Sequence, residues 1–209
     1  MKIALFGGTG RTGGLLLAGA LSRGHTVQLL ARRPDVLPAT DGVTVIAGDL
    51  LARDGADVRE TLHGCDAVLA AIGSAGLGTP GEAIGTGTSH IAKGCQAAGI
   101  RRVVSLGGGG ILDAAGGGLR RDRPGYPAVF GPVSAQHLAA WQALAAAGLE
   151  YTIVCTPDLT DGPATGQYRL VVRMMPEGGK RVSRADVAAV MLDALEQGRW
   201  IHERVGMAE

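Results

Sequence analysis

Three glycines spaced by two residues stand near the start of the chain, in the pattern G-x-x-G-x-x-G. Glycine has no Cβ, so this spacing suits a tight turn on whose bare backbone a diphosphate can lie. A helix that begins at such a turn offers unpaired N–H groups, which stabilise an anion. The spacing therefore indicates a dinucleotide-binding turn, with a turn that binds no ligand as the alternative. The candidate contacts are Gly7, Thr9, Gly10, Arg11, Thr12 and Gly13.

The pair Arg32 and Arg33 follows an apolar stretch at residues 26–31. In a unit that binds NAD, an acid at this place usually accepts a hydrogen bond from the ribose 2′-OH. Guanidinium groups stand here instead, and these suit a 2′-phosphate, unless both are simply solvated. NADP(H) is therefore the expected cofactor. NAD(H) is less favoured but stays open, because Asp35 could turn inward.

The elements that must position these residues alternate between strand and helix. Residues 3–6 are an apolar run typical of a buried parallel strand, and the leucine-rich stretch at 15–21 is typical of a helix that stops near Gly24. The alternation continues along the chain, which predicts an α/β fold with a doubly wound parallel sheet of Rossmann type, in one domain over 1–209. Further strands are predicted at 26–31, 43–47, 66–72, 102–106 and 151–155, with small peripheral strands at 168–174 and 180–182. Helices are predicted at 54–62, 81–98, 133–147 and 183–197, which leaves a short tail from Trp200.

Ligands in such sheets bind beyond the carboxyl ends of the strands. A helix or turn cap is the alternative role for the acid that follows the third strand. The residues expected to line the cofactor are therefore Asp49 and Leu50 after the third strand, and Ala71, Ile72, Gly73 and Ser74 at the end of the fourth.

A long loop is predicted at 107–132, rich in glycine and containing the basic run RRDR at 120–123. Loops of this length in a compact domain are usually functional or disordered. We expect a mobile flap over the substrate side with RRDR solvated, and a disordered surface loop is the alternative. Ser183 is expected to cap the last helix, with Asp186 as its partner in a capping box.

The composition limits the classes of function. With 209 residues, of which 46% are hydrophobic and 19% charged, the chain can bury one sizeable core. A formal net charge of +1 gives no electrostatic case for nucleic acid or an anionic membrane, and no apolar run approaches the ~20 residues of a membrane span. Cys65, Cys95 and Cys155 are widely spaced, so they indicate buried thiols, no metal site and a cytoplasmic protein. A monomer or homodimer that acts on a small-molecule acceptor is expected.

The proton-donating pair of ordinary short-chain dehydrogenases is a tyrosine followed four residues later by a lysine. The residues at that spacing after the three tyrosines are Phe130, Cys155 and Val172. The pair is absent, which disfavours ordinary alcohol–ketone chemistry. An epimerase or dehydratase that recycles its cofactor is disfavoured too, because such enzymes usually keep the tyrosine.

The stretch QHLAAWQALAAAGLEYTIVCTPDLTDGPATGQYRL, at 136–170, resembles the matching stretch of the flavin reductase and biliverdin-IXβ reductase family. This family lies within the NmrA-like group of atypical short-chain dehydrogenases/reductases. KIALFGGTGRTG, GDL and RVSRADVAAVML agree as well, so the resemblance covers nearly the whole chain. It implies a reductase that passes hydride from NADPH to a flavin, a linear tetrapyrrole or a quinone-like acceptor, for which solvent can supply the proton.

The resemblance also implies roles for single residues. The family's phosphate loop falls on residues 10–13, its 2′-phosphate arginine on Arg32 and its adenine-side acid on Asp49. The helix histidine of the family falls on His137, where other short-chain relatives have the lysine, and the place of the tyrosine falls on Val133. The nicotinamide-side backbone falls on Ile72, Gly73 and Pro157.

Three positions depart from the family pattern. The family serine falls near Gly108, a second histidine is replaced by Asp158, and a helix histidine is replaced by Trp141. An acid at Asp158 is expected to repel anionic acceptors such as tetrapyrrole propionates, unless it serves as a loop cap. His137 and Trp141 share a helix face, as a proton donor or substrate contact beside an aromatic platform. A hydrogen-bonded, half-buried histidine and a core tryptophan are the alternative.

Together these observations predict an NADPH-dependent reductase of a flavin- or quinone-like acceptor, with His137 catalytic and with Trp141 and Asp158 at the substrate. The alternative is a non-catalytic NAD(P)-binding redox sensor of the NmrA-like type, which the missing tyrosine, lysine and serine favour. Turnover of an acceptor distinguishes the two.

Overall fold

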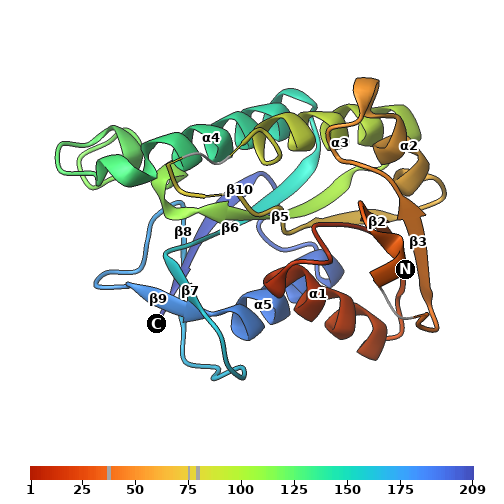
Figure 1. Cartoon of the computed structure of the whole chain (residues 1–209). Helices are drawn as coiled ribbons and strands as arrows, with labels where there is room; N and C mark the ends of the chain where they lie inside the picture. Colours follow the sequence, from red (N-terminus) through yellow and green to blue (C-terminus); the bar gives the residue numbers. More distant parts are fainter. Residues whose placement is uncertain (37–38, 75, 79–80) are drawn as a thin grey trace.

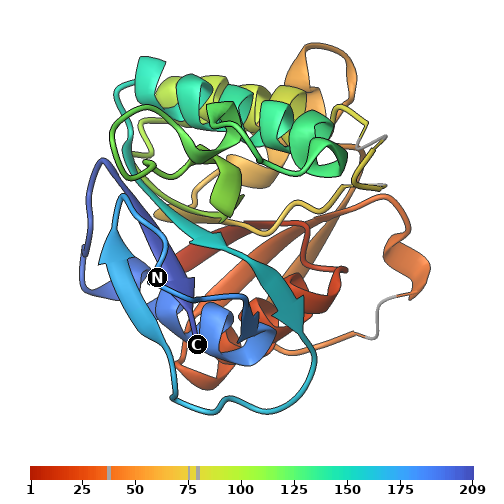
Figure 2. The same cartoon turned by 90° about the vertical axis from the view of Figure 1, so that its left-hand side faces the viewer.

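The computed structural model describes residues 1–36, 39–74, 76–78 and 81–209. One eight-stranded sheet crosses the molecule, and helices cover both of its faces (Figure 1, Figure 2). On one face lie α1 (Arg11–Ser22) and α5 (Arg184–Glu196), and on the other α2 (Ala56–Leu62), α3 (Gly85–Ala98) and α4 (Gly131–Ala146). Among the described residues, none of these helices has the length and apolar character needed to cross a membrane. The predicted α/β fold of Rossmann type is confirmed.

The main sheet has the strand order β3-β2-β1-β4-β5-β6-β10-β8, and its neighbours are parallel except for β10 and β8. The order changes direction between β1 and β4, which opens a crevice for ligands at the carboxyl ends of these strands. The strands are β1 (Lys2–Phe6), β2 (Thr26–Ala31), β3 (Val43–Ala47), β4 (Ala67–Ala70), β5 (Arg102–Gly108), β6 (Glu150–Thr156), β8 (Arg169–Val172) and β10 (Glu203–Ala208).

The strand β1 is apolar on both sides because helices cover both faces of the sheet. Ile3 and Leu5 belong to the core cluster that includes α1 and α5, whereas Ala4 and Phe6 belong to the cluster on the opposite face. All four side chains are buried. The helix α1 begins at Arg11, four residues before the predicted start, so the glycine turn leads directly into it.

The C-terminal part departs from the prediction. The stretch expected to be a short tail contains β10, which lies inside the sheet between β6 and β8. The strand predicted at 168–174 is β8, an edge strand of the main sheet that pairs antiparallel with β10. The strand predicted at 180–182 is β9 (Arg181–Ser183), which pairs with β7 (Asp158–Thr160) in a separate two-stranded sheet, and β7 is absent from the predicted strands.

The first part of the segment predicted as a loop at 107–132 packs on the sheet, whereas none of residues 114–130 is buried. Its first two glycines extend β5, its last two residues begin α4, and three short 3-10 turns lie between them. Ile111 is buried, and its carbonyl accepts a hydrogen bond from Arg204 of β10, which also pairs with Asp113 at 2.8 Å. In Figure 1 this green segment lies at the left end of the molecule, on the α4 side of the sheet. It covers the crevice on that side, while its mobility stays a prediction.

The predicted capping box of α5 is correct only for its first member. Ser183 Oγ accepts a hydrogen bond from the N–H of Ala185 at 3.1 Å. The carboxylate of Asp186 instead accepts hydrogen bonds from the N–H groups of Thr165 and Gly166, both at 2.9 Å. The acid therefore anchors the loop that follows β7, because that loop offers it unpaired donors.

Candidate functional site

The turn between β1 and α1 contains two glycines that the chain itself requires. Gly7 has a φ of +80°, in the left-handed region, and a methyl carbon there would lie 2.7 Å from the carbonyl carbon of Ala71. A methyl carbon at Gly13 would lie 2.7 Å from the carbonyl carbon of Gly7. Both neighbours are backbone, which cannot move aside as a side chain can. These glycines let the turn close against the end of β4 and let α1 start beside it.

Gly10 differs from Gly7 and Gly13, because an added methyl carbon at Gly10 would have much more space within the described chain. Its φ is −83°, which any residue can adopt, and a methyl carbon would meet only the carbonyl oxygen of Gly7, at 3.3 Å. Gly10 is the N-cap of α1, and the first turn of that helix has no capping side chain and no acid. The open face of Gly10 and the uncompensated helix end fit the diphosphate of a dinucleotide.

The end of β2 presents two free cations. Arg32 and Arg33 are both exposed, and neither has an ion-pair or hydrogen-bond partner within the described ranges. Asp35, which would favour NAD(H) if it turned inward, is exposed in a 3-10 turn. The arginines are thus available for a 2′-phosphate, and the preference for NADP(H) stays a prediction.

The residues after β3 are held by local contacts. Asp49 Oδ1 accepts a hydrogen bond from the N–H of Leu51 at 2.9 Å, which is the turn-capping role that was left open. A carboxylate has a second oxygen, so this cap leaves room for a contact with adenine. The carbonyl of Leu50 lies 3.0 Å from Nδ1 of His90 on α3, which fixes the backbone at this point. The cofactor roles of Asp49 and Leu50 stay predictions.

Arg11 already has a partner. Its guanidinium lies 3.1 Å from the carboxylate of Asp161, which also pairs with Arg184 at 2.7 Å. The side chains of Arg11 and Asp161 are 70% and 66% exposed, whereas that of Arg184 is 10% exposed. One carboxylate therefore connects the glycine turn to the loop after β7.

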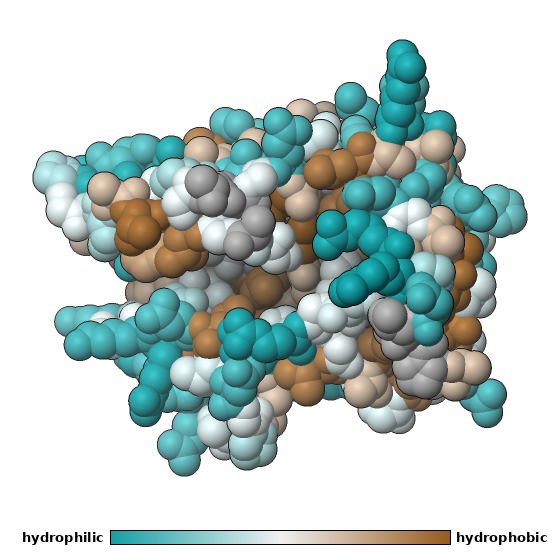
Figure 3. All heavy atoms as spheres, viewed as in Figure 1, coloured by the Kyte–Doolittle hydropathy of each residue, from teal (hydrophilic) through white to brown (hydrophobic). Residues whose placement is uncertain are grey.

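A pocket of about 610 Å³ opens beyond the carboxyl ends of β4, β5 and β6. Its walls are largely apolar, with contributions from Leu106, Phe130 and Met175. In the view of Figure 3 a hollow with hydrophobic residues on its floor lies between the upper and lower halves of the molecule. Size and lining are those of a small-molecule site. Of the predicted site residues it brings together Ile72, Gly73, Ser74, His137, Pro157 and Asp158.

His137 lies on the first half of α4, half-buried against β5. A methyl carbon at Gly108 would lie 2.8 Å from Cδ2 of this imidazole and 3.2 Å from Nε2, so the ring occupies the space beside the position where the family serine falls. Burial lowers the pKa of His137 to about 4. The imidazole is therefore neutral at pH 7, and it can donate a hydrogen bond but does not act as a cationic acid.

A hydroxyl pair reaches the pocket, with Tyr126 on the segment before α4 and Ser134 on the first turn of α4. The hydroxyl oxygens of Tyr126 and Ser134 lie 2.6 Å apart, and both residues line the pocket. Val133, which holds the place of the family tyrosine, lines it too. A tyrosine hydroxyl is thus present at the pocket wall, although it comes from a different position in the chain.

Trp141 does not line this pocket, contrary to the prediction. Its Nε1 donates a hydrogen bond to the hydroxyl of Tyr151 at 3.1 Å, and the guanidinium of Arg204 lies 3.8 Å from the centre of its ring. The indole packs against the core cluster on this face of the sheet. This packing agrees with the alternative of a core tryptophan, and a substrate role for Trp141 stays a prediction.

Sequence reasoning missed many of the lining residues, among them Arg120, Tyr126, Phe130 and Lys180. A partial signal existed, because Phe130, Val133 and His137 recur at helical spacing and so share one face. Arg120 was expected to be solvated, and Lys180 reaches the pocket only through the pairing of β7 with β9.

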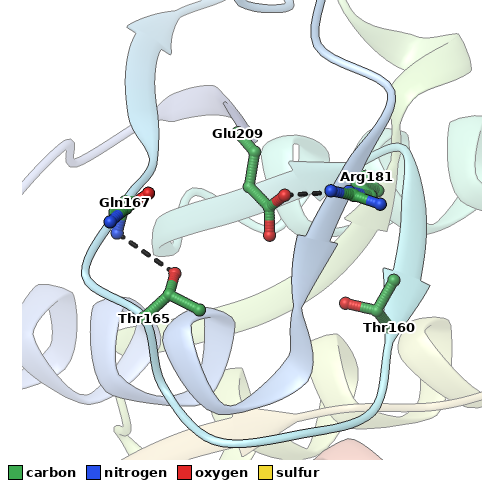
Figure 4. Close-up of a pocket in the computed structure, with 5 residues that line it drawn as sticks. All are labelled: Thr160, Thr165, Gln167, Arg181 and Glu209. Carbon is green, nitrogen blue, oxygen red and sulfur yellow. Dashed lines mark hydrogen bonds and ion pairs between the residues drawn. The ribbon is translucent and has the colours of Figure 1, made fainter.

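A second hollow, of about 530 Å³, lies beside β7 and β9 and contains none of the predicted site residues (Figure 4). Its polar groups largely satisfy one another: Arg181 Nε donates to Glu209 at 2.9 Å, and the N–H of Gln167 donates to Thr165 Oγ1 at 3.1 Å. The pocket of about 610 Å³ is therefore the stronger candidate site.

Comparisons with known proteins agree with this geometry. Among solved structures, a candidate exported protein from Burkholderia pseudomallei is 31% identical, with a TM-score of 0.84 and coverage of 100% of both chains. A candidate NADH-flavin reductase from Streptococcus pneumoniae is 24% identical, with a TM-score of 0.82 and coverage of 100% of this chain and 99% of that one.

A short-chain dehydrogenase/reductase from Veillonella parvula, in complex with NADP, is 20% identical, with a TM-score of 0.76 and coverage of 100% of this chain and 94% of that one. At this identity, as for the Streptococcus protein, the likeness shows the fold alone. A family model described as NAD(P)H-binding matches residues 7–198. The match spans the glycine turn, the crevice and the pocket, and the protein belongs to this NAD(P)H-binding family.

Proposed function

We propose that the protein is an NADPH-dependent reductase that passes hydride to a flavin- or quinone-like acceptor. The observation that carries this proposal is the pocket of about 610 Å³, in which the expected nicotinamide-side residues Ile72, Gly73 and Pro157 face apolar and aromatic walls. A planar ring system can lie in such a space, and the volume falls in the range of small-molecule sites.

Different residues of the chain bind different parts of the coenzyme. The N-terminus of α1 and the open face of Gly10 hold the diphosphate, and Arg32 holds the 2′-phosphate through charge-assisted hydrogen bonds. Asp49 contacts the adenine with its free carboxylate oxygen. When bound, the reduced nicotinamide supplies the hydride. Pro157 and Gly73 line the pocket, and neither has a long side chain, which allows close approach of a flat ring.

Tyr126 lines the pocket but lacks a lysine four residues later, so the ordinary proton-donating pair is not assembled on it, which favours acceptors that take their proton from water. His137 is neutral at pH 7 because burial lowers its pKa to about 4, so it orients an acceptor oxygen or nitrogen through its N–H instead of delivering a proton. A reduced flavin or quinone can be protonated by solvent, whereas a simple ketone needs a positioned donor. This difference supports the flavin- or quinone-like class.

The direct test is a turnover assay that follows NADPH absorbance with FMN, riboflavin and a set of quinones. Val133→Phe narrows the pocket, and Val129→Phe is the matched control, because Val129 is 53% exposed and lies outside the pocket lining. We expect Val133→Phe to reduce turnover at least about tenfold while NADPH binding, measured by fluorescence, is kept. Equal turnover in both variants would place the reaction elsewhere.

A non-catalytic redox sensor is the second candidate, and the neutral His137 favours it as well. In that case NADPH binds in the micromolar range or tighter, and no acceptor in the set is reduced. The assay separates the two functions because coenzyme binding is measured independently of turnover.

We also propose a reducing, cytoplasmic location. The three cysteines are free and buried, and burial raises the pKa of Cys95 and of Cys155 to about 12, so these thiols stay protonated. The relative from Burkholderia is described as exported, so cell fractionation with an antibody to this protein is the deciding measurement.

A further inference from the structure

Three charged side chains line the acceptor pocket: Arg120, Asp158 and Lys180. The sequence predicts that Asp158 repels anionic acceptors, but that prediction does not include the two cations, Arg120 and Lys180, that line the same pocket. His137, the remaining titratable imidazole of the wall, is neutral because of burial. The lining therefore carries one net positive charge at pH 7, which attracts an anion.

Arg120 is an unpaired cation. Within the described ranges no carboxylate lies at ion-pair distance from it, and its Nε is buried without a hydrogen-bond partner. A half-buried guanidinium in this state has lost part of its hydration without gaining a protein partner, which is unfavourable. An anionic group of a ligand removes that cost. The arginines that do have acidic partners are Arg11, Arg23, Arg53, Arg101, Arg121, Arg173, Arg181, Arg184 and Arg204.

The backbone that carries Arg120 is held in place. The N–H of Arg120 donates to the carbonyl of Leu112 at 2.8 Å, and Leu112 is fully buried. Asp113, which follows Leu112 in the sequence, donates its N–H to the carbonyl of Arg173 at 2.7 Å, and its carboxylate pairs with Arg204 at 2.8 Å. The guanidinium is thus attached to a fixed base, which lowers the entropic cost of binding an anion.

We propose that Arg120, assisted by Lys180, forms a subsite for an anionic arm of the acceptor, so that the pocket prefers an acceptor such as FMN over its uncharged counterpart. This inference rests on the proposed function. The phosphates of the coenzyme are the other possible source of the anion. They are assigned to α1, which packs on one face of the sheet, whereas the segment of Arg120 packs on the other. The arm of the acceptor is therefore the partner that this position fits.

FMN and riboflavin form a matched pair of probes, because they share the ring system and differ in one phosphate. Their affinities are measured by quenching of flavin fluorescence, and their KM values by NADPH oxidation. For the unchanged protein we expect FMN to bind about tenfold more tightly than riboflavin, as the loss of one charge-assisted hydrogen bond predicts. The preference is expected to weaken at high salt.

The variants isolate the charge of Arg120. Arg120→Gln and Lys180→Gln remove pocket cations, and Arg120→Lys keeps the charge without the planar donor group. Arg123→Gln is the matched control, because Arg123 is exposed, lies on the same segment and does not line the pocket. We expect Arg120→Gln to raise the FMN dissociation constant about tenfold, with riboflavin and NADPH binding unchanged, and Arg120→Lys to restore part of the preference.

The outcomes separate this inference from the proposed function. If both flavins are reduced with equal KM, the subsite is overturned and the reductase stands. If FMN binds preferentially through Arg120 and neither FMN nor any quinone of the set is reduced, the subsite stands and the reductase falls. A loss of NADPH binding in Arg120→Gln assigns the cation to the coenzyme and overturns the subsite. If neither flavin binds, the subsite is overturned, and the reductase falls if no quinone is reduced either.

Discussion

Replacing Gly10 with alanine separates binding of the coenzyme from folding, and Gly13→Ala is its counterpart in the same turn. At Gly10 the added methyl carbon lies 3.3 Å from the carbonyl oxygen of Gly7, only 0.1 Å short of the 3.4 Å at which ordinary contacts begin. At Gly13 it lies 2.7 Å from the carbonyl carbon of Gly7, which is 0.7 Å short, and the neighbour is backbone. The two variants therefore add the same atom with different consequences.

The stability effects follow from these overlaps. Overpacking that forces backbone to move costs up to about 3 kcal/mol, so Gly13→Ala is expected to lose about 3 kcal/mol, or about 6–12 °C in Tm for a chain of this size. Gly10→Ala changes only the N-cap of α1, which costs less than about 1 kcal/mol. Its methyl group occupies the face assigned to the diphosphate, so NADPH binding is expected to weaken at least about tenfold.

Thermal unfolding without coenzyme measures the first effect, and a calorimetric titration with NADPH measures the second. The reasoning is refuted if Gly10→Ala binds NADPH as the unchanged protein does, since the open face of Gly10 would then have no ligand. It is also refuted if Gly10→Ala lowers Tm as much as Gly13→Ala.

Three further predictions concern charged groups. Arg32→Ala is expected to raise the Kd for NADPH at least about tenfold and the Kd for NADH less than about twofold, with Arg53→Ala as the exposed control, and equal losses for both coenzymes would contradict the 2′-phosphate assignment. His137 has a folded-state pKa of about 4, below the 6.5 of a free histidine. The unfolded chain therefore binds more protons between these values, stability falls as pH drops from 6.5 to 4, and His137→Gln removes this part of the fall in Tm. An unchanged pH profile would argue against burial of the ring. Arg204→Leu is expected to lower the free energy of unfolding by about 3 kcal/mol in urea, because the guanidinium is 8% exposed, donates to the carbonyl of Ile111 and stacks on Trp141, whereas the side chain of Arg173 is 57% exposed and Arg173→Leu costs less than about 1 kcal/mol. Similar losses in both would refute the ranking by burial.

The N-terminal half of the fold could be predicted because its signals are local. The strands at 26–31 and 43–47 coincide with β2 and β3. β2 is buried along nearly its whole length, as a mostly apolar run predicts for a parallel strand that is covered on both faces. β10 was missed for the opposite reason. Its partners β6 and β8 lie far away in the sequence, and a six-residue strand that contains a glycine has little local signal.

The residues of the candidate site also fall into those that the sequence could predict and those that it could not. Residues that follow a predicted strand, such as Gly73 and Pro157, are found at the pocket because the carboxyl ends of parallel strands share one edge. Arg120 and Lys180 could not be placed, because their positions depend on how a glycine-rich segment and a two-stranded sheet fold back onto the crevice. The side-chain direction of Trp141 depends on packing against Arg204, which no spacing rule contains.

The carboxylate of Asp161 sits between two guanidinium groups, one exposed on Arg11 and one nearly enclosed on Arg184. Arg11 is therefore already paired before a dinucleotide binds. If a phosphate of the dinucleotide pairs with Arg11, the guanidinium exchanges one anionic neighbour, the carboxylate of Asp161, for another. The net Coulomb gain is a difference between two contacts, so ionic strength affects coenzyme affinity less steeply than the number of arginines around the turn suggests. The same exchange would break the contact between the glycine turn and the loop after β7, while Arg184 and Asp186 continue to hold that loop to α5.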